Sequence, residues 1–262
     1  MSTTTSTSTT MTQTQPQQPQ QLKFSATARD PMATMHEMVT NHMQQFDPSH
    51  DMHHVNRVVR MAKVLARKVA ETQPVDEKVV EVAALLHDVN DSKYRDQLNN
   101  GEDVMMKCLQ ESDLTQEQQD LVVKIANNMS YSTEKKLREA GQWGKWHNEC
   151  VELHLVQDAD RLDAIGAMGI LRLAAYSGAK NRPLVLTGDE DDEDTMSHFG
   201  AKLLHMHKKM KTAPGREVAL KRTAIMRDMV TNAFDEVTLA DLGEKTPELE
   251  TIGDVVKERW IM

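Results

Sequence analysis

The chain has 262 residues, a formal net charge of −9 and 39% hydrophobic residues. This acidity argues against a general nucleic-acid-binding protein, although a small nucleotide would need only a local positive site. The two cysteines, Cys108 and Cys150, argue against a disulfide framework, and no apolar run is long enough to span a membrane. We therefore expect a cytoplasmic protein, with a nuclear location or mitochondrial import as alternatives.

Residues 1–30 are rich in Ser, Thr and Gln, and they lack the apolar stretch of a secretory signal. Such a segment buries too little apolar surface to fold, so it is predicted to be disordered. Residues 31–242 are predicted to form one domain, and residues 243–262 a C-terminal tail. Aromatic residues make up only 4% of the chain, whereas there are 18 Met, and a core of aliphatic residues and Met favours an all-α fold.

The predicted helices follow from the spacing of apolar residues. Between residues 55 and 69 the apolar side chains fall on one helical face. Asp76 is expected to cap the next helix, which is apolar on nearly every side over residues 79–86 and therefore lies at the centre of the fold. That helix ends in His87 and Asp88. Further helices are predicted over residues 100–111, 115–128, 149–176, 195–211 and 214–235, and the acidic run within residues 188–195 predicts an exposed loop.

Candidate metal ligands stand on three of these helices: His54, the pair His87 and Asp88, and either Asp158 or Asp160. Convergent imidazole and carboxylate groups suit a divalent ion, with Mn²⁺ expected and Fe, Co, Ni, Zn or Mg as alternatives. Asp88 follows an apolar helix, where a carboxylate without a cationic partner would be costly. Asp158 and Asp160 lie about 200° apart on a helix, so only one should face the ion. Any one of these histidines taken alone would be an ordinary core or surface residue.

Residues 50–66, 82–94 and 156–172 resemble the HD-domain superfamily of metal-dependent phosphohydrolases, and the similarity extends over about residues 32–236. More narrowly, the chain resembles small stand-alone HD hydrolases of bacteria and fungi, some of which are nucleoside-triphosphate pyrophosphohydrolases. The resemblance implies a helical bundle with a metal site between its central helices. It also implies the ligand set His54, His87, Asp88 and Asp160, in which Asp160 is preferred to Asp158.

Four further residues are candidates for catalysis and substrate binding. Related HD enzymes carry an acidic residue three positions after the metal-binding Asp, and Asp91 occupies that position. We expect Asp91 to act on the attacking water and Lys93 to neutralise phosphate charge, unless both belong to an ordinary polar loop. We expect two cations to bind the substrate phosphate. They are Arg57, one turn after His54, and Lys202, which lies in a locally basic stretch. An ion pair with Asp51 or another neighbour is an equally good account of Arg57.

Two questions about neighbouring residues stay open. Asp51, together with His50, could orient the metal ligands, or Asp51 could only cap its helix. Of Arg161 and Asp163, which lie on the last metal-binding helix, one is expected in a buried ion pair.

The predicted function is metal-dependent hydrolysis of a phosphoester or phosphoanhydride by an activated water. The substrate is expected to be a small phosphate compound, and the resemblance implies a nucleotide. We expect neither an extended nucleic acid nor a membrane as a partner. An oligomer is compatible with the sequence. One alternative is a non-catalytic HD domain that binds a nucleotide or a partner protein as a sensor. Another is a metal-free helical scaffold.

Overall fold

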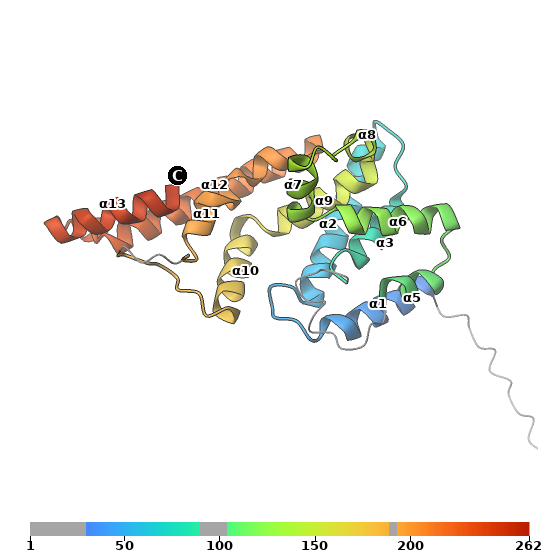
Figure 1. The fold of residues 1–262 in the computed structure, drawn as a ribbon, viewed down its shortest axis with the longest axis horizontal. Coiled ribbons are helices and arrows are strands. Elements are labelled where there is room, and N and C mark those ends of the chain that lie inside the picture. Colours follow the sequence, from blue (N-terminus) through green and yellow to red (C-terminus); the bar gives the residue numbers. More distant parts are fainter. Residues whose placement is uncertain (1–29, 90–103, 189–192, 262) are drawn as a thin grey trace, which may run out of the picture.

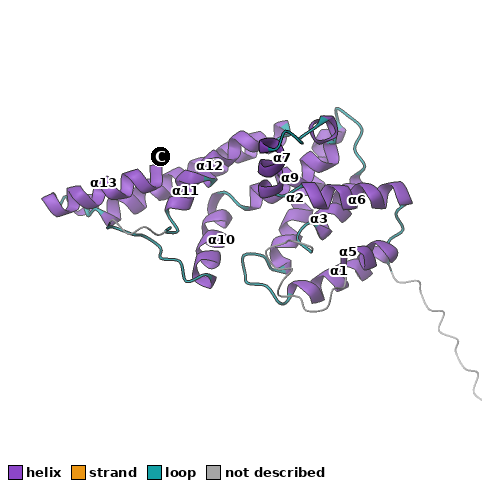
Figure 2. Ribbon diagram, viewed as in Figure 1, coloured by secondary structure: helices purple, strands orange, loops and turns teal. Residues whose placement is uncertain are grey.

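The computed structural model describes residues 30–89, 104–188 and 193–261. These residues form helices and contain no β-strand, which confirms the predicted all-α class (Figure 2). Three predicted features lie outside the described residues: the disordered segment up to residue 29, the candidate catalytic residues Asp91 and Lys93, and most of the acidic run. No helix in the described ranges is long and apolar enough to cross a membrane.

Three helices form the centre of the fold. α2 (Met52–Ala70) begins where the Asp51 carboxylate accepts a hydrogen bond from the backbone N–H of His54. α3 (Glu77–Leu86) is capped in the same way by Asp76, as predicted, and its apolar residues are almost completely buried. α9 (Val151–Asp163) packs against both α2 and α3. The start of α2, the end of α3 and the later turns of α9 therefore meet.

Shorter helices surround this centre. They are α1 (Pro31–Met43), α5 (Val104–Gln110), α6 (Gln116–Asn128), α7 (Tyr131–Glu139) and α8 (Lys145–Glu149). α1 packs on α5, and α6 packs on α3 (Figure 1). The apolar pattern predicts α5 and α6 but gives no indication of α7 and α8.

The single helix predicted over residues 149–176 is wrong, because the chain leaves the helical path after α9 and resumes as α10 (Gly166–Ala179). Gly166 has a φ of +77°, which glycine adopts without the clash that a side chain would cause. At Gly169 a Cβ atom would overlap the carbonyl group of Ala164. These two glycines allow the sharp change of direction between the helices.

The C-terminal part runs through α11 (Ser197–Ala201), the 3₁₀ helix η1 (Leu203–Lys209), α12 (Ala213–Val237), η2 (Ala240–Leu242) and α13 (Pro247–Ile261). Lys202, with a φ of −139°, divides the single helix predicted over residues 195–211 into α11 and η1. The segment predicted as a tail consists mostly of α13, which packs against α11 and α12. Its Trp260 is completely buried and donates a hydrogen bond to Asp194. Figure 1 shows α12 and α13 extending together away from the central helices.

Candidate metal centre

His54 lies in the first turn of α2 and is completely buried. Its Nδ1 atom is 2.8 Å from Oδ2 of Asp163, whose pKa lies below the usual range and which is therefore an acceptor. Nδ1 must then carry the proton and donate it. The Nε2 atom, on the other side of the ring, is left with its lone pair directed toward the end of α3.

His87 directly follows α3 and mirrors this arrangement. Its Nδ1 atom is 2.8 Å from the carbonyl oxygen of Ala84, which can only accept a hydrogen bond. Its Nε2 atom therefore faces Nε2 of His54 at 3.2 Å. Two imidazole lone pairs at this distance repel each other unless a proton or a metal ion lies with them. Both rings are thus oriented as metal ligands, with the second nitrogen of each held by a fixed partner.

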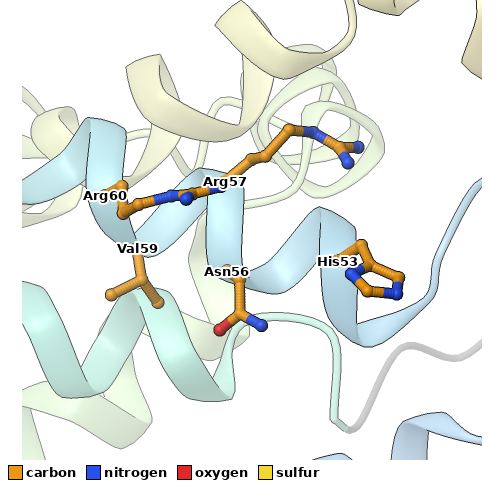
Figure 3. A pocket seen from close by; sticks show the side chains of 5 residues that line it. All are labelled: His53, Asn56, Arg57, Val59 and Arg60. Carbon is orange, nitrogen blue, oxygen red and sulfur yellow. The ribbon is translucent and has the colours of Figure 1, made fainter.

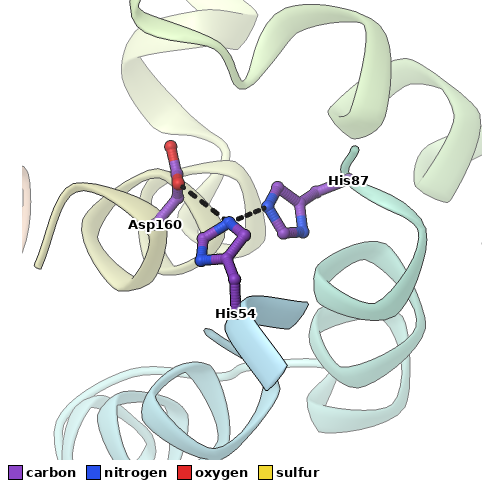
Figure 4. A group of neighbouring side chains, drawn as sticks. All are labelled: His54, His87 and Asp160. Carbon is purple, nitrogen blue, oxygen red and sulfur yellow. Dashed lines mark hydrogen bonds and ion pairs between the residues drawn. The ribbon is translucent and has the colours of Figure 1, made fainter. Parts of the chain in front are cut away.

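Two carboxylates complete the group. Oδ2 of Asp88 lies 3.2 Å from Nε2 of His87 and 3.3 Å from Nε2 of His54, and Oδ1 of Asp160 lies 3.7 Å from the same His54 atom. Ligand atoms of His54, His87 and Asp160 all fall within 4.8 Å of one another, and Figure 4 shows these side chains pointing toward a common centre. The donors come from three helices and fit a divalent ion that accepts nitrogen and oxygen ligands.

The electrostatics of the group favour a positive charge. Burial disfavours the charged imidazolium of His87, but the carboxylates of Asp88 and Asp160 outweigh burial and raise the pKa of His87 to about 9. Burial acts to raise the pKa of Asp88, yet the two imidazoles hold it well below the usual range. A divalent ion would take the place of this proton, so metal binding at this site releases protons.

Asp163 lies behind His54 on α9 and is 2% exposed. Besides His54, it accepts hydrogen bonds from Nε and Nη2 of Arg57 at 2.8 and 2.9 Å, and Arg172 lies 3.2 Å away. Burial opposes its ionisation, but these partners lower the pKa of Asp163. A carboxylate that orients a ligand imidazole is a recurrent feature of metal centres. The local sequence gives no indication of this role beyond the spacing, by which Asp163 follows Asp160 by one helical turn.

Asp158 faces away from the cluster. Its carboxylate accepts hydrogen bonds from the backbone N–H of Lys211, and from the backbone N–H and hydroxyl of Thr212, all at 2.7–2.8 Å. Burial raises the pKa of Asp158. Asp158 therefore ties α9 to the start of α12, whereas Asp160 on the other side of α9 points toward the histidines. The two aspartates therefore face opposite sides of α9, as their angular separation on a helix implies.

The structure also shows where the predicted substrate ligands lie. Arg57 forms an ion pair, as in the alternative account of this residue, but its partner is Asp163 instead of Asp51. Lys202 Nζ lies 4.8 Å from the centre of the Tyr131 ring, a cation–π contact between the end of α11 and the start of α7. Asp51 caps α2, and His50 is hydrogen-bonded through Nδ1 to Ser49.

A buried ion network holds α7 against α9. Glu134 of α7 accepts hydrogen bonds from Arg161 and Lys211, both at 2.6 Å. Burial acts against its charge, but these cations lower the pKa of Glu134 to about 2. Both Arg161 and Asp163 are therefore in buried ion pairs, whereas we expect this of only one of them. Gln157, one turn before Asp160, donates a hydrogen bond to the carbonyl oxygen of Met129, just before the start of α7.

Several known proteins resemble this chain in sequence or in fold. Residues 52–165 match the HD domain. The Bacillus subtilis protein YpgQ is 36% identical over 181 residues, which cover 69% of this chain and 81% of YpgQ. The crystal structure of YpgQ in complex with ADP superposes with a TM-score of 0.61 at 30% identity and covers 77% of this chain and 97% of that one. An HD-superfamily hydrolase from Bacillus thuringiensis superposes with a TM-score of 0.56 at 29% identity, over 79% of this chain and 98% of that one.

The segment that matches the HD domain contains all four residues of the His and Asp cluster, together with Asp163. The match to YpgQ extends the similarity well beyond that segment. The chain belongs to the HD-domain family.

Proposed function

We propose that this protein is a metal-dependent phosphohydrolase that acts on a nucleotide. One observation carries the proposal: the Nε2 atoms of His54 and His87 face each other at 3.2 Å, while the Nδ1 atom of each ring is held by a fixed acceptor. A structural pair of histidines has no need of this orientation. With carboxylate oxygens of Asp88 and Asp160 at 3.3 and 3.7 Å from Nε2 of His54, the four side chains offer the donors that a divalent ion requires.

His54, His87, Asp88 and Asp160 would hold the ion, for which we propose Mn²⁺. When bound, such an ion lowers the pKa of a coordinated water and polarises a phosphoryl oxygen. Asp163 keeps His54 in its ligating tautomer, and Arg57 keeps Asp163 charged and in place. We therefore assign Arg57 to the support of His54 instead of to binding of the substrate phosphate. Asp91 and Lys93 keep their proposed roles at the attacking water and the phosphate, on the grounds of sequence position alone.

A nucleotide substrate is supported by the ADP complex of YpgQ and by the surroundings of the site. Lys202 supplies a cation for phosphate oxygens, and Tyr131 beside it supplies an aromatic ring on which a base can stack. The hydrogen bond from Gln157, one turn before Asp160, to Met129, two residues before Tyr131, supports this assignment. We propose that Lys202 binds the substrate phosphates.

Turnover of a panel of nucleotides with added Mn²⁺ tests the proposal, with phosphate and pyrophosphate measured separately. We expect hydrolysis that stops with a chelator and resumes when the ion is restored. The Lys202→Gln variant should mainly raise KM, while the matched variant Lys208→Gln on the neighbouring η1 should behave as the wild type. Full activity in a metal-free sample would contradict the proposal, and tight nucleotide binding without turnover would favour the sensor function.

A further inference from the structure

Helix α2 is locally basic in an acidic chain. Its 19 residues include five Arg or Lys and two His but no acidic residue, in a protein of net charge −9. Lys63 is paired with Glu81 of α3 and Arg57 with Asp163. Arg60 is exposed and has no ion pair or hydrogen bond within the described ranges. The outer side of α2 is therefore a local positive surface on an acidic molecule.

A hollow of about 390 Å³ lies on this side of α2, and Figure 3 shows the side chains that line it. They are His53, Asn56, Arg57, Val59 and Arg60. The described lining thus offers two guanidinium groups, an imidazole and an amide, and contains no carboxylate. Because a water occupies about 30 Å³ of liquid, a small hydrated anion fits this volume. Among the described lining residues the only aromatic ring is the imidazole of His53, so the lining offers a nucleotide base no Phe, Tyr or Trp ring on which to stack.

The hollow is connected to the metal centre through two hydrogen-bonded contacts. Arg57 lines the hollow and donates two hydrogen bonds to Asp163, and Asp163 accepts the Nδ1 proton of His54. The Nε2 atom of His54, on the opposite side of the ring, belongs to the ligand cluster. An anion in the hollow is therefore separated from the cluster by His54 and Asp163, so it cannot be the phosphate that reacts there.

We propose that this hollow is a second site, which binds a small tetrahedral oxyanion such as inorganic phosphate through Arg57 and Arg60. Guanidinium groups bind phosphate oxygens in the same forked geometry as carboxylates. A bound anion and Asp163 would thus compete for the guanidinium group of Arg57. Occupation of the hollow weakens the hold of Asp163 on His54 and lowers the affinity of the cluster for its metal ion. Only this last step rests on the proposed metal centre.

The first test measures inorganic phosphate binding to the full-length, chelator-treated protein by calorimetry at constant ionic strength. Arg60→Gln should weaken binding about tenfold or more, as expected for the loss of one charge-assisted hydrogen bond. Arg67→Gln is the matched control, because Arg67 is exposed on the same helix but does not line the hollow. It should bind as the wild type does. No phosphate binding by the wild type, or an equal loss in both variants, would overturn the site.

The second test compares Mn²⁺ titrations in sulfate and in chloride at equal ionic strength. We expect sulfate to weaken Mn²⁺ binding to the wild type and to Arg67→Gln by about tenfold. This is the low end of the loss in metal affinity that follows when a ligand histidine loses the residue that orients it. Arg60→Gln should show no such difference. An equal effect of sulfate on all three proteins would show that the anion acts at the cluster itself. The phosphate test needs neither metal nor turnover, so failure of the proposed hydrolase activity would not decide it.

Discussion

Replacing Asp163 by Asn should weaken both metal binding and the fold. The amide keeps the size of the side chain but loses the charge that pairs with Arg57 and Arg172. It can also present its NH₂ group to Nδ1 of His54, which would allow the ring to adopt the other tautomer. Replacing a residue that orients a metal ligand typically lowers metal affinity by about 10–100-fold. We expect the Mn²⁺ affinity of Asp163→Asn to fall within that range.

The loss of stability can be worked out from the same contacts. Breaking a buried ion pair costs about 3–5 kcal/mol, and a hydrogen bond to a charged group contributes about 1.5–3 kcal/mol. The side chain of Arg57 is 23% exposed, so water recovers part of this cost, and the Asn oxygen can still accept one bond. We therefore expect a loss of about 3 kcal/mol, which lowers Tm by about 6–12 °C in a protein of this size.

Asp160→Asn is the control for this experiment. It removes a candidate ligand that is 27% exposed and makes no ion pair with an Arg or Lys in the described residues. It should therefore lose the metal and keep the Tm of the metal-free wild type. Calorimetric Mn²⁺ titration and thermal unfolding of chelated samples measure the two effects separately. If Asp163→Asn kept both the affinity and the Tm of the wild type, our account of how His54 is oriented would be wrong.

Three further predictions concern the fold and the candidate catalytic residue Asp91. Gly215→Ala should lower the free energy of unfolding by about 1–3 kcal/mol, because the alanine Cβ would overlap the Asp158 carboxylate. An unchanged Tm would show that the start of α12 can shift at no cost. Glu134 has a pKa that falls from 4.5 to about 2 on folding, so its contribution of about 3 kcal/mol is present above pH 4.5 and is lost as the pH falls toward 2. Urea unfolding should show this decline in the wild type and not in Glu134→Gln. Asp91→Asn should keep metal binding and lose about two orders of magnitude in turnover, whereas turnover within about threefold of the wild type would assign Asp91 to an ordinary polar loop.

The centre of the fold could be predicted because its signals are local. The continuous apolar stretch of α3 places His87 and Asp88 at the end of a buried helix, and the amphipathic pattern of α2 places His54 at the start of another. The resemblance then supplies Asp160. Each of these residues stands beside a strong helical pattern, so the convergence of the three helices brings them together.

The remaining features depend on contacts between residues far apart in sequence. Arg57 pairs with Asp163 across 106 positions, and nothing near either residue distinguishes this partner from a substrate phosphate. The break between α9 and α10 follows from the positive φ of Gly166 and the close approach at Gly169, in a stretch whose apolar pattern continues unbroken. α13 is held by the burial of Trp260 against Asp194, a contact across 66 positions.

Mn²⁺ titration of the chelated Asp160→Ala and Asp158→Ala variants, beside the wild type, tests the central claim most directly. Asp160 points toward the two imidazoles, and Asp158 anchors α12. We predict that Asp160→Ala loses Mn²⁺ binding, while Asp158→Ala keeps most of it and unfolds at a lower temperature. Wild-type Mn²⁺ affinity in Asp160→Ala would contradict the account, as would the loss of the metal from Asp158→Ala alone.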